Sequence, residues 1–287
     1  DALVFFSLLH YTTVQGLAVA PGRSVLFPHL QLHPALRFGV WSDLARSARA
    51  IGYISAAERS IARSFLGVTP EVEEVVGIGV HSTPQQTYPR HQQDPGDNPA
   101  SEDEIATETE VALEPEYLAG RGVPFRRRHR LYGPFALYGG RVESDNGCEE
   151  MLEYFDSFSS AGGDTMLVLM GVKLMKVPEA PYLNLAGVLP DRERMIAYEA
   201  ADVTLAPATT DLFAQPVLES LAVGTPVLAA AMNCAAVEHC RRSNAGLYYA
   251  NCDEFVAALR LMTADARLRE KMGENGRRYV EQHHSLD

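Results

Sequence analysis

The sequence predicts an α/β fold built on an open, doubly wound parallel sheet. Between residues 131 and 287, short apolar runs alternate with longer segments whose apolar residues recur at helical spacing. The apolar runs, such as Met166–Met170, are apolar nearly throughout, which is typical of parallel strands buried on both faces. Glycine and proline separate helix from strand, as at Gly224 and Pro226.

Residues 1–80 are predicted to form the end of one α/β domain. The chain starts within what we interpret as a buried strand, Asp1–Leu9, and it has neither an initiator Met nor a basic leader segment. We therefore expect it to begin inside a domain. Ser55 and Glu58 have the spacing of a capping box and open a helix that Gly67 ends. Further predicted strands are Val25–Pro28, Ala48–Ile54 and Val75–Val80, the last of which is either a full strand or one that ends at a hinge.

Residues 81–130 differ in composition from both neighbours. Pro, Gln, Asp, Asn and Glu dominate, and no hydrophobic period is sustained, which predicts an interdomain connection with a loop. The basic cluster Arg126–Arg130 is expected to lie on a solvated loop and to balance the acidic residues between Glu102 and Glu116. Contact of this cluster with an anionic lipid or acceptor is the less favoured alternative.

Residues 131–287 are predicted to form a complete second domain, in which strands and helices alternate. The predicted strands are Phe135–Gly139, Met166–Met170, Leu183–Gly187, Ala201–Pro207, Pro226–Ala230 and Gly246–Tyr249. The predicted helices are Cys148–Phe158, one that begins at Asp191, one from Pro216 to Gly224, one near Val237, one carrying Phe255–Met262 and one carrying Leu268–Tyr279. Parallel strands joined by helices require right-handed crossovers.

Composition limits the classes of function. The 287 residues suffice for two domains, and the net charge of −12 argues against unspecific nucleic-acid binding, although a local basic pocket could still hold one diphosphate. The four cysteines have no zinc-ligand spacing, so we expect buried free thiols in a reducing compartment and no metal site. These cysteines are Cys148, Cys234, Cys240 and Cys252. No apolar run approaches the length of about 18 residues that a membrane span needs.

Two carboxylates mark the most informative segment. Asp211 lies in the loop after the strand Ala201–Pro207, and Glu219 lies one to two turns into the helix that starts at Pro216. Such a unit points the free N–H groups of a helix N-terminus into a crevice, which suits a phosphate. Taken alone, the two carboxylates could equally well be a loop residue and an exposed helical residue that stabilise the helix dipole.

The segment from Pro207 to Val227 resembles the signature of the retaining glycosyltransferases of family four, which have the GT-B fold. That signature places two Glu residues, separated by seven others, in Pro-Ser-x-x-Glu-x-Phe-Gly…Glu-Ala-x-Ala-x-Gly-x-Pro-Val. In this chain Asp211 replaces the first Glu, and Leu212 and Ala214 stand where Gly is usual. Residues 140–147 resemble the family's Gly-Arg-x-x-x-x-Lys-Gly turn, in which Arg141 matches and Asn146 replaces Lys.

The resemblance implies a GT-B architecture, with a complete C-terminal Rossmann-like domain in residues 131–287 and a partial N-terminal Rossmann-like domain in residues 1–80. It implies retaining transfer of a sugar from a nucleoside-diphosphate sugar to a saccharide, lipid or small-molecule acceptor. Neither a cofactor nor a metal is expected, and UDP or GDP is the expected nucleotide. A cytoplasmic location is expected, with peripheral attachment to the inner face of a membrane as a variant of it. The oligomeric state stays open.

Two other functions remain as alternatives. One is a catalytically decayed nucleotide-sugar-binding or partner subunit, which the three altered positions Asn146, Asp211 and Leu212 favour. The other is a GT-B epimerase of nucleotide sugars, which would need a full amino-terminal half.

The resemblance also implies roles for individual residues. Asp211 would contact the hydroxyls of the donor sugar, Arg141 would neutralise the diphosphate, and both are expected to be catalytic. Glu219 would hold the ribose, and the backbone of residues 212–215 would bind phosphate. The full expected donor set is Gly140, Arg141, Asn146, Gly187, Leu189, Leu212, Phe213, Ala214, Gln215 and Glu219. The candidates on the acceptor side are His10, Gln31 and His33.

Overall fold

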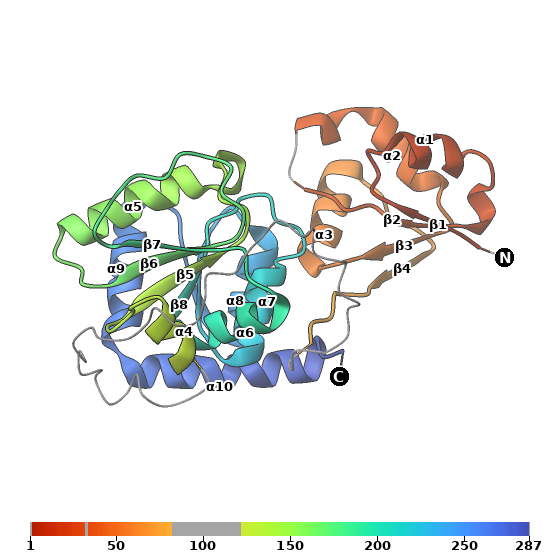
Figure 1. Cartoon of the computed structure of the whole chain (residues 1–287). Coiled ribbons are helices and arrows are strands. Elements are labelled where there is room, and N and C mark those ends of the chain that lie inside the picture. The colour runs from red at the N-terminus through yellow and green to blue at the C-terminus, as the bar shows by residue number, and fades with distance from the viewer. Residues whose placement is uncertain (1, 32–33, 82–121, 287) are drawn as a thin grey trace, which may run out of the picture.

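The computed structural model describes residues 2–31, 34–81 and 122–286, and it confirms the predicted α/β class. Two parallel sheets, of four and six strands, form two domains that lie beside each other (Figure 1). This pair of parallel sheets agrees with the architecture that the resemblance implies, with a smaller first domain. His33 and most of the expected interdomain connection lie outside the described residues.

The first domain is a parallel sheet in the order β1-β2-β3-β4. Its strands are β1 (Leu3–Phe6), β2 (Ser24–Phe27), β3 (Ala50–Tyr53) and β4 (Val72–Val75), and its helices are α1 (Tyr11–Leu17), α2 (Gly39–Ser47) and α3 (Ala56–Ile61). The predicted capping box is present, because the Ser55 hydroxyl accepts a hydrogen bond of 3.0 Å from the Glu58 amide. Twelve buried apolar residues, among them Leu26, Ile51 and Tyr53, form a core of their own.

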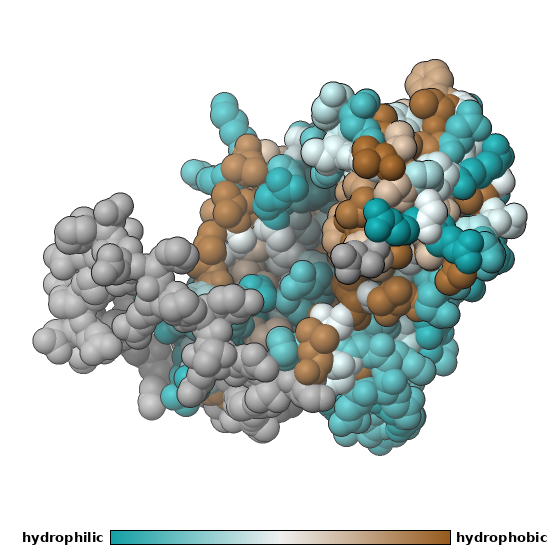
Figure 2. Space-filling view, turned by 90° about the vertical axis from the view of Figure 1, so that its right-hand side faces the viewer, coloured by the Kyte–Doolittle hydropathy of each residue, from teal (hydrophilic) through white to brown (hydrophobic). Residues whose placement is uncertain are grey.

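The first strand is less buried than predicted. Within the part of the chain that the structure describes, β1 is an edge strand that pairs with β2 alone. Three of its four residues are more than two-fifths exposed: Leu3 41%, Val4 51% and Phe6 56%. The prediction of a buried strand is therefore wrong, because an apolar run does not reveal whether a strand is central or at an edge. Figure 2, which looks onto the first domain, shows hydrophobic residues interspersed with hydrophilic ones on this face.

The prediction of a strand at Val75–Val80 is wrong, because the strand there, β4, spans Val72–Val75 and shares only Val75 with the predicted range. β4 stops at Val75, and the residues after it cross to the second domain. There the Val80 amide donates to the His284 carbonyl at 2.8 Å, and the Leu286 amide donates to the Val80 carbonyl at 3.2 Å.

The second domain is a parallel sheet in the order β10-β9-β8-β5-β6-β7. Its strands, β5 (Phe135–Gly139), β6 (Met166–Met170), β7 (Leu183–Gly187), β8 (Val203–Ala206), β9 (Val227–Ala230) and β10 (Gly246–Tyr249), lie within two residues of the predicted ones. The chain runs outward from β5 to β7 and returns to β8 on the other side of β5. The loops after β5 and β8 therefore diverge, which leaves a crevice at the carboxyl ends of these strands.

Helices cover both faces of this sheet (Figure 1). They are α4 (Val123–Arg128), α5 (Cys148–Ser160), α6 (Asp191–Ala200), α7 (Gln215–Val223), α8 (Cys234–Ser243), α9 (Cys252–Ala264) and α10 (Ala266–His283). α10 is the longest, and it runs along the second domain until its end reaches the residues that follow β4 (Figure 1). A second contact between the domains is the hydrogen bond of 2.8 Å from the Ala57 amide to Glu238 Oε2.

The basic cluster does not form the solvated loop that we predicted. Residues 123–128 are helical, and Arg126 is 6% exposed. Its guanidinium donates to Asp202 at 3.0 Å and to the Gly133 carbonyl at 2.8 Å, and it stacks on the Phe135 ring at 4.6 Å. An arginine can be buried when its charge is paired and its donors are satisfied, and composition alone does not show such a pairing.

The four thiols are free, but only Cys148 and Cys240 are buried as predicted. The prediction of buried thiols is wrong for the other two, because Cys234 is exposed and Cys252 is intermediate. Within residues 2–31, 34–81 and 122–286, no group of three or more His, Cys, Asp or Glu side chains could hold a metal ion. Nor does that part of the chain contain a helix long and apolar enough to cross a membrane.

Candidate functional site

A cavity of about 520 Å³ lies in the crevice at the carboxyl ends of β5 and β8. Its walls are the turn after β5, the loop after β8 and the first residues of α7, and Gln31 reaches it from the first domain. Its polar side chains are Gln31, Tyr138, Arg141, Glu143, Asp145, Asn146, Thr210, Asp211 and Asn233. The volume falls in the range of small-molecule sites.

The turn after β5 is closed by hydrogen bonds to the Arg141 carbonyl. The Tyr138 hydroxyl donates to this carbonyl at 2.7 Å, and Nδ2 of the Asn146 side chain donates to it at 3.0 Å. The turn needs glycine at 147, which has a φ of 71°, because a Cβ there would lie 2.5 Å from the Pro207 carbonyl oxygen. The turn is thereby brought directly against the loop after β8.

Burial keeps two groups of this turn protonated. It raises the pKa of both the Tyr138 hydroxyl and the Cys148 thiol above their ordinary values. A protonated thiol is a poor nucleophile. Cys148 therefore packs beneath the turn without reactive character.

The Arg141 guanidinium lies open to solvent at the mouth of the cavity. Its side chain is 66% exposed and forms an ion pair of 3.0 Å with Glu143. An exposed pair of this kind is weak, so a diphosphate with higher charge can compete for the guanidinium.

Asp211 folds back onto its own loop. Its Oδ1 atom accepts hydrogen bonds from the Phe213 and Ala214 amides, both at 3.0 Å. Ala214 is the N-cap of α7 and has a φ of 44°, which turns the chain sharply into the helix. Two of the four amides expected to hold a diphosphate thus already bind a carboxylate, with which an incoming phosphate would compete.

Glu219 faces α6 and does not line the cavity. It is 6% exposed, and its carboxylate receives two hydrogen bonds from Arg194, at 3.1 and 2.9 Å, and one of 2.9 Å from Gln215. Arg194 was missed by the sequence analysis. The sequence feature that points to Arg194 is its position near the start of the helix after Leu183–Gly187. Arg192 has the same position, so the sequence does not distinguish the two arginines.

The charge of the cavity is less suited to a diphosphate than the resemblance implies. Among the described residues that line it, one guanidinium, Arg141, stands beside three carboxylates, Glu143, Asp145 and Asp211. Asn146 supplies a hydrogen-bond donor where the family pattern has a positive charge. A phosphate entering here meets net negative charge, which opposes its binding.

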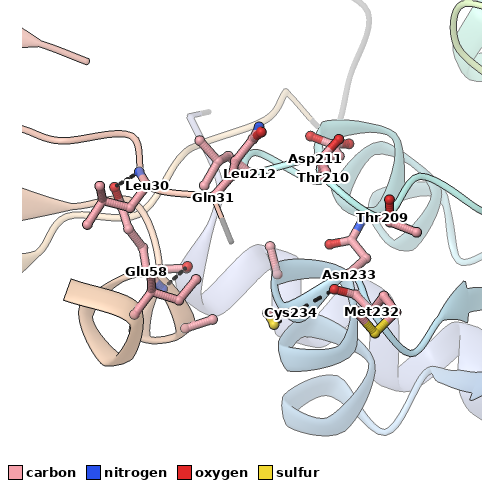
Figure 3. Close-up of a pocket in the computed structure, with 14 residues that line it drawn as sticks. Leu30, Gln31, Glu58, Thr209, Thr210, Asp211, Leu212, Met232, Asn233 and Cys234 are labelled. Atoms are coloured by element: carbon pink, nitrogen blue, oxygen red, sulfur yellow. Dashed lines mark hydrogen bonds between the residues drawn. The ribbon is translucent and has the colours of Figure 1, made fainter. Parts of the chain in front are cut away.

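Gln31 lies at a second, smaller cavity between the domains (Figure 3). Below it, the buried Glu58 carboxylate accepts hydrogen bonds from the Leu30 amide at 2.9 Å and the Ile54 amide at 2.6 Å. Burial raises the pKa of Glu58. These bonds tie together the segments after β2 and β3, and they fix the backbone next to Gln31.

His29 is a second residue that the candidate set lacked. Its ring meets the Phe213 ring edge-on, with centroids 5.4 Å apart, so it joins the first domain to the loop of Asp211. Burial, with a further contribution from His10, lowers the pKa of His29.

The structure divides the predicted site residues into two groups. Around the larger cavity it gathers Gly140, Arg141, Asn146, Asp211, Leu212, Phe213 and Gln31. Away from the lining of that cavity lie Gly187, Leu189, Ala214, Gln215, Glu219 and His10. Gly187 is nevertheless close by, because its carbonyl accepts from Gly171, and a Cβ on Gly171 would collide with the Gly140 carbonyl oxygen at 1.9 Å.

Comparison with known proteins gives a match for the second domain. The family model "Glycosyl transferases group 1" matches residues 124–279. No curated protein matches the sequence.

Several solved structures share the fold of the whole chain. The chain superposes on sucrose-phosphate synthase from Thermosynechococcus elongatus with a TM-score of 0.70 and 15% identity, covering 98% of this chain and 69% of that one. For Anabaena Alr3699/HepE in complex with UDP, the TM-score is 0.71 and the identity 15%, and the match covers 99% of this chain and 75% of that one. For WaaG, a glycosyltransferase involved in lipopolysaccharide biosynthesis, the TM-score is 0.64 and the identity 16%, and the match covers 98% of this chain and 74% of that one.

Proposed function

This chain belongs to the family of glycosyl transferases group 1, and from that premise we propose that it is a retaining glycosyltransferase acting on a nucleoside-diphosphate sugar. The observation that carries the proposal is the cavity where the turn of Arg141 and the loop of Asp211 meet, with Gln31 from the other domain at its edge. A donor bound at the carboxyl ends of β5 and β8 would face an acceptor held by the first domain. A saccharide, a lipid and a small molecule all remain as acceptors.

Charge on the leaving group is the central demand of this chemistry. The bond from the sugar to the diphosphate breaks, and the oxygen of the acceptor hydroxyl bonds to the same face of the sugar. The departing nucleotide gains negative charge, and its phosphate oxygen takes the proton that the acceptor hydroxyl loses. We assign its stabilisation to the Arg141 guanidinium, which must leave Glu143 to reach the phosphates. Asn146 would assist with a hydrogen bond but without charge.

The two carboxylates of the signature would serve different parts of the donor. Asp211 is assigned to the sugar hydroxyls, through the oxygen that does not cap the loop, and Glu219 to the ribose. The structure of the Anabaena relative holds UDP, which supports uracil as the first base to test. GDP is the next choice.

A catalytically decayed subunit that only binds nucleotide sugars is the second candidate function. It is favoured by the single guanidinium among three carboxylates and by the binding of Asp211 to loop amides. A GT-B epimerase is a third candidate, without an observation that favours it.

Calorimetric titration with UDP, GDP and ADP tests the proposal. We expect one nucleotide to bind, and absence of binding at about 1 mM would end both the transferase and the binding-subunit proposals. Binding without hydrolysis or transfer of the matching nucleotide sugar would favour the decayed subunit. Glu219→Ala should weaken binding, and an unchanged dissociation constant would remove Glu219 from the site.

A gain-of-function variant tests the effect of the altered positions. The double change Asn146→Lys and Asp211→Glu restores the family pattern at these two positions and adds one positive charge to the cavity. It should raise transfer or donor hydrolysis, since electrostatic contacts to a leaving group often contribute several kcal/mol. Unchanged rates would show that these two positions do not limit the reaction.

A further inference from the structure

We propose that Arg194 is a positioning residue for nucleotide binding, which holds the Glu219 carboxylate so that it can accept one ribose hydroxyl and not two. The inference rests on the proposed function, because it concerns how Glu219 would bind the nucleotide. It assigns a role to a residue of α6 that the signature segment does not contain.

The contact between Arg194 and Glu219 is a two-bond pair. Arg194 Nε lies 3.1 Å from Oε2, and Nη2 lies 2.9 Å from Oε1. This parallel geometry, which lysine cannot form, fixes the plane of the carboxylate. Arg194 is itself held from behind, because its Nη1 atom donates to Asp191 Oδ1 at 2.7 Å.

The number of acceptor positions limits what Glu219 can still bind. A carboxylate offers about four lone-pair directions. Two are taken by Arg194 and a third by Gln215, whose Nε2 lies 2.9 Å from Oε1. About one direction therefore remains for an external donor, enough for a single hydroxyl.

The pair lies at the end of the domain where the nucleotide would bind. α6 follows β7 and α7 follows β8, so both helices begin at the carboxyl edge of the sheet. Arg194 is in the first turns of α6, and Glu219 is one turn beyond Pro216 and Val217, which line the cavity. A carboxylate already immobilised here loses little further conformational entropy when a ribose binds.

The alternative is a pair that only fastens α6 to α7. The Glu219 side chain is 8% exposed, so loss of its partner should destabilise the fold whatever the function. Stability alone therefore cannot separate the two roles. Discrimination between ribose and deoxyribose can, because a purely structural pair has no reason to affect it.

The test measures dissociation constants by calorimetry for UDP, 2′-deoxy-UDP and 3′-deoxy-UDP, with the guanine and adenine analogues run alongside. The unmodified chain should bind the ribonucleotide at least about tenfold more tightly than one of its two deoxy analogues, because one hydrogen bond to Glu219 is lost. It should bind the other deoxy analogue about as tightly as the ribonucleotide, so that only one of the two affinity ratios is large. Arg194→Lys keeps the charge but removes the two-bond geometry, and it should reduce the larger ratio to about threefold or less. Arg192→Gln, an exposed arginine of the same helix, should leave the ratio unchanged.

If Arg194→Lys does not fold, the double variant Arg194→Gln, Glu219→Gln replaces it in the test, because it removes both charges together. It should show no discrimination between ribose and deoxyribose. Arg194→Lys with a lower melting temperature but an unchanged ratio would overturn the inference and leave the proposed function intact. Equal binding of all three nucleotides by the unmodified chain would also overturn the inference; it would remove Glu219 from the ribose but leave the proposed transfer reaction standing. Absence of binding to every nucleotide would overturn the proposed function, and the inference with it.

Discussion

Acid should destabilise this protein through a buried chain of hydrogen bonds that ends at His239. His284 Nδ1 lies 2.8 Å from the Ile78 carbonyl oxygen, which can only accept, so Nδ1 carries the proton. In neutral His284 the other ring nitrogen then accepts from the Tyr279 hydroxyl at 3.0 Å. The Tyr279 oxygen in turn lies 3.0 Å from His239 Nδ1, which must donate. The chain is complete only while His284 is neutral, because its Nε2 must accept; His239 donates from Nδ1 whether or not it is protonated, and burial is what opposes its charged form.

The magnitude follows from the pKa of His239. Burial, followed by the nearby His284 and Arg242, lowers this pKa from 6.5 to about 3. Below pH 6.5 the unfolded chain therefore takes up a proton that the folded chain does not, and stability falls until the pH nears 3. Between pH 6.5 and 4.5 the loss from this group alone is roughly 2 kcal/mol, a large part of a typical folding free energy.

Urea unfolding at pH 7.5, 6.5, 5.5 and 4.5 measures this loss. His239→Gln replaces the ring with an amide that can still donate to Tyr279 but does not titrate. The difference in unfolding free energy between the original chain and the variant should shrink by roughly 2 kcal/mol between pH 6.5 and pH 4.5. The exposed neighbour His283, changed to Gln, provides the control and should give a parallel profile. Parallel profiles for His239→Gln as well would refute the argument.

Three further predictions concern single side chains. Asp211→Ala frees two amides ahead of α7, so UDP should bind about 5- to 30-fold more tightly in calorimetry, and weaker binding would contradict this. Glu238→Ala removes the carboxylate that the first domain's α3 binds, and the radius of gyration in X-ray scattering should increase; identical scattering would count against the contact. Arg126→Met breaks a buried pair and should cost about 3 kcal/mol in urea unfolding. Arg128→Met, at an exposed pair, should cost less than ~1 kcal/mol, and equal losses would show that burial is irrelevant.

The second domain could be predicted from sequence because its signals are local. Apolar runs such as Met166–Met170 and the stop at Gly224 lie within the elements that they define. The burial of Arg126 could not be predicted, since its partner Asp202 is 76 residues away. The exposure of β1 depends in the same way on what lies beside the strand and not on its own residues.

The candidate site shows the same division. The proximity of Arg141 and Asp211 follows from their positions after β5 and β8, two strands that pair in the sheet. The partners of each carboxylate do not follow from spacing, because side-chain conformation decides them. Asp211 is short enough to reach its own loop amides, and Glu219 meets an arginine from a neighbouring helix. Their roles toward a ligand stay predictions.

The way α10 ends has a practical consequence for anyone who labels this protein. Leu286 packs so closely on Gly79 that a Cβ added to Gly79 would lie 2.3 Å from the Leu286 side chain. The Val80 amide also donates a backbone hydrogen bond to the His284 carbonyl. A dye or spin label placed beside these residues would therefore report movement of one domain against the other.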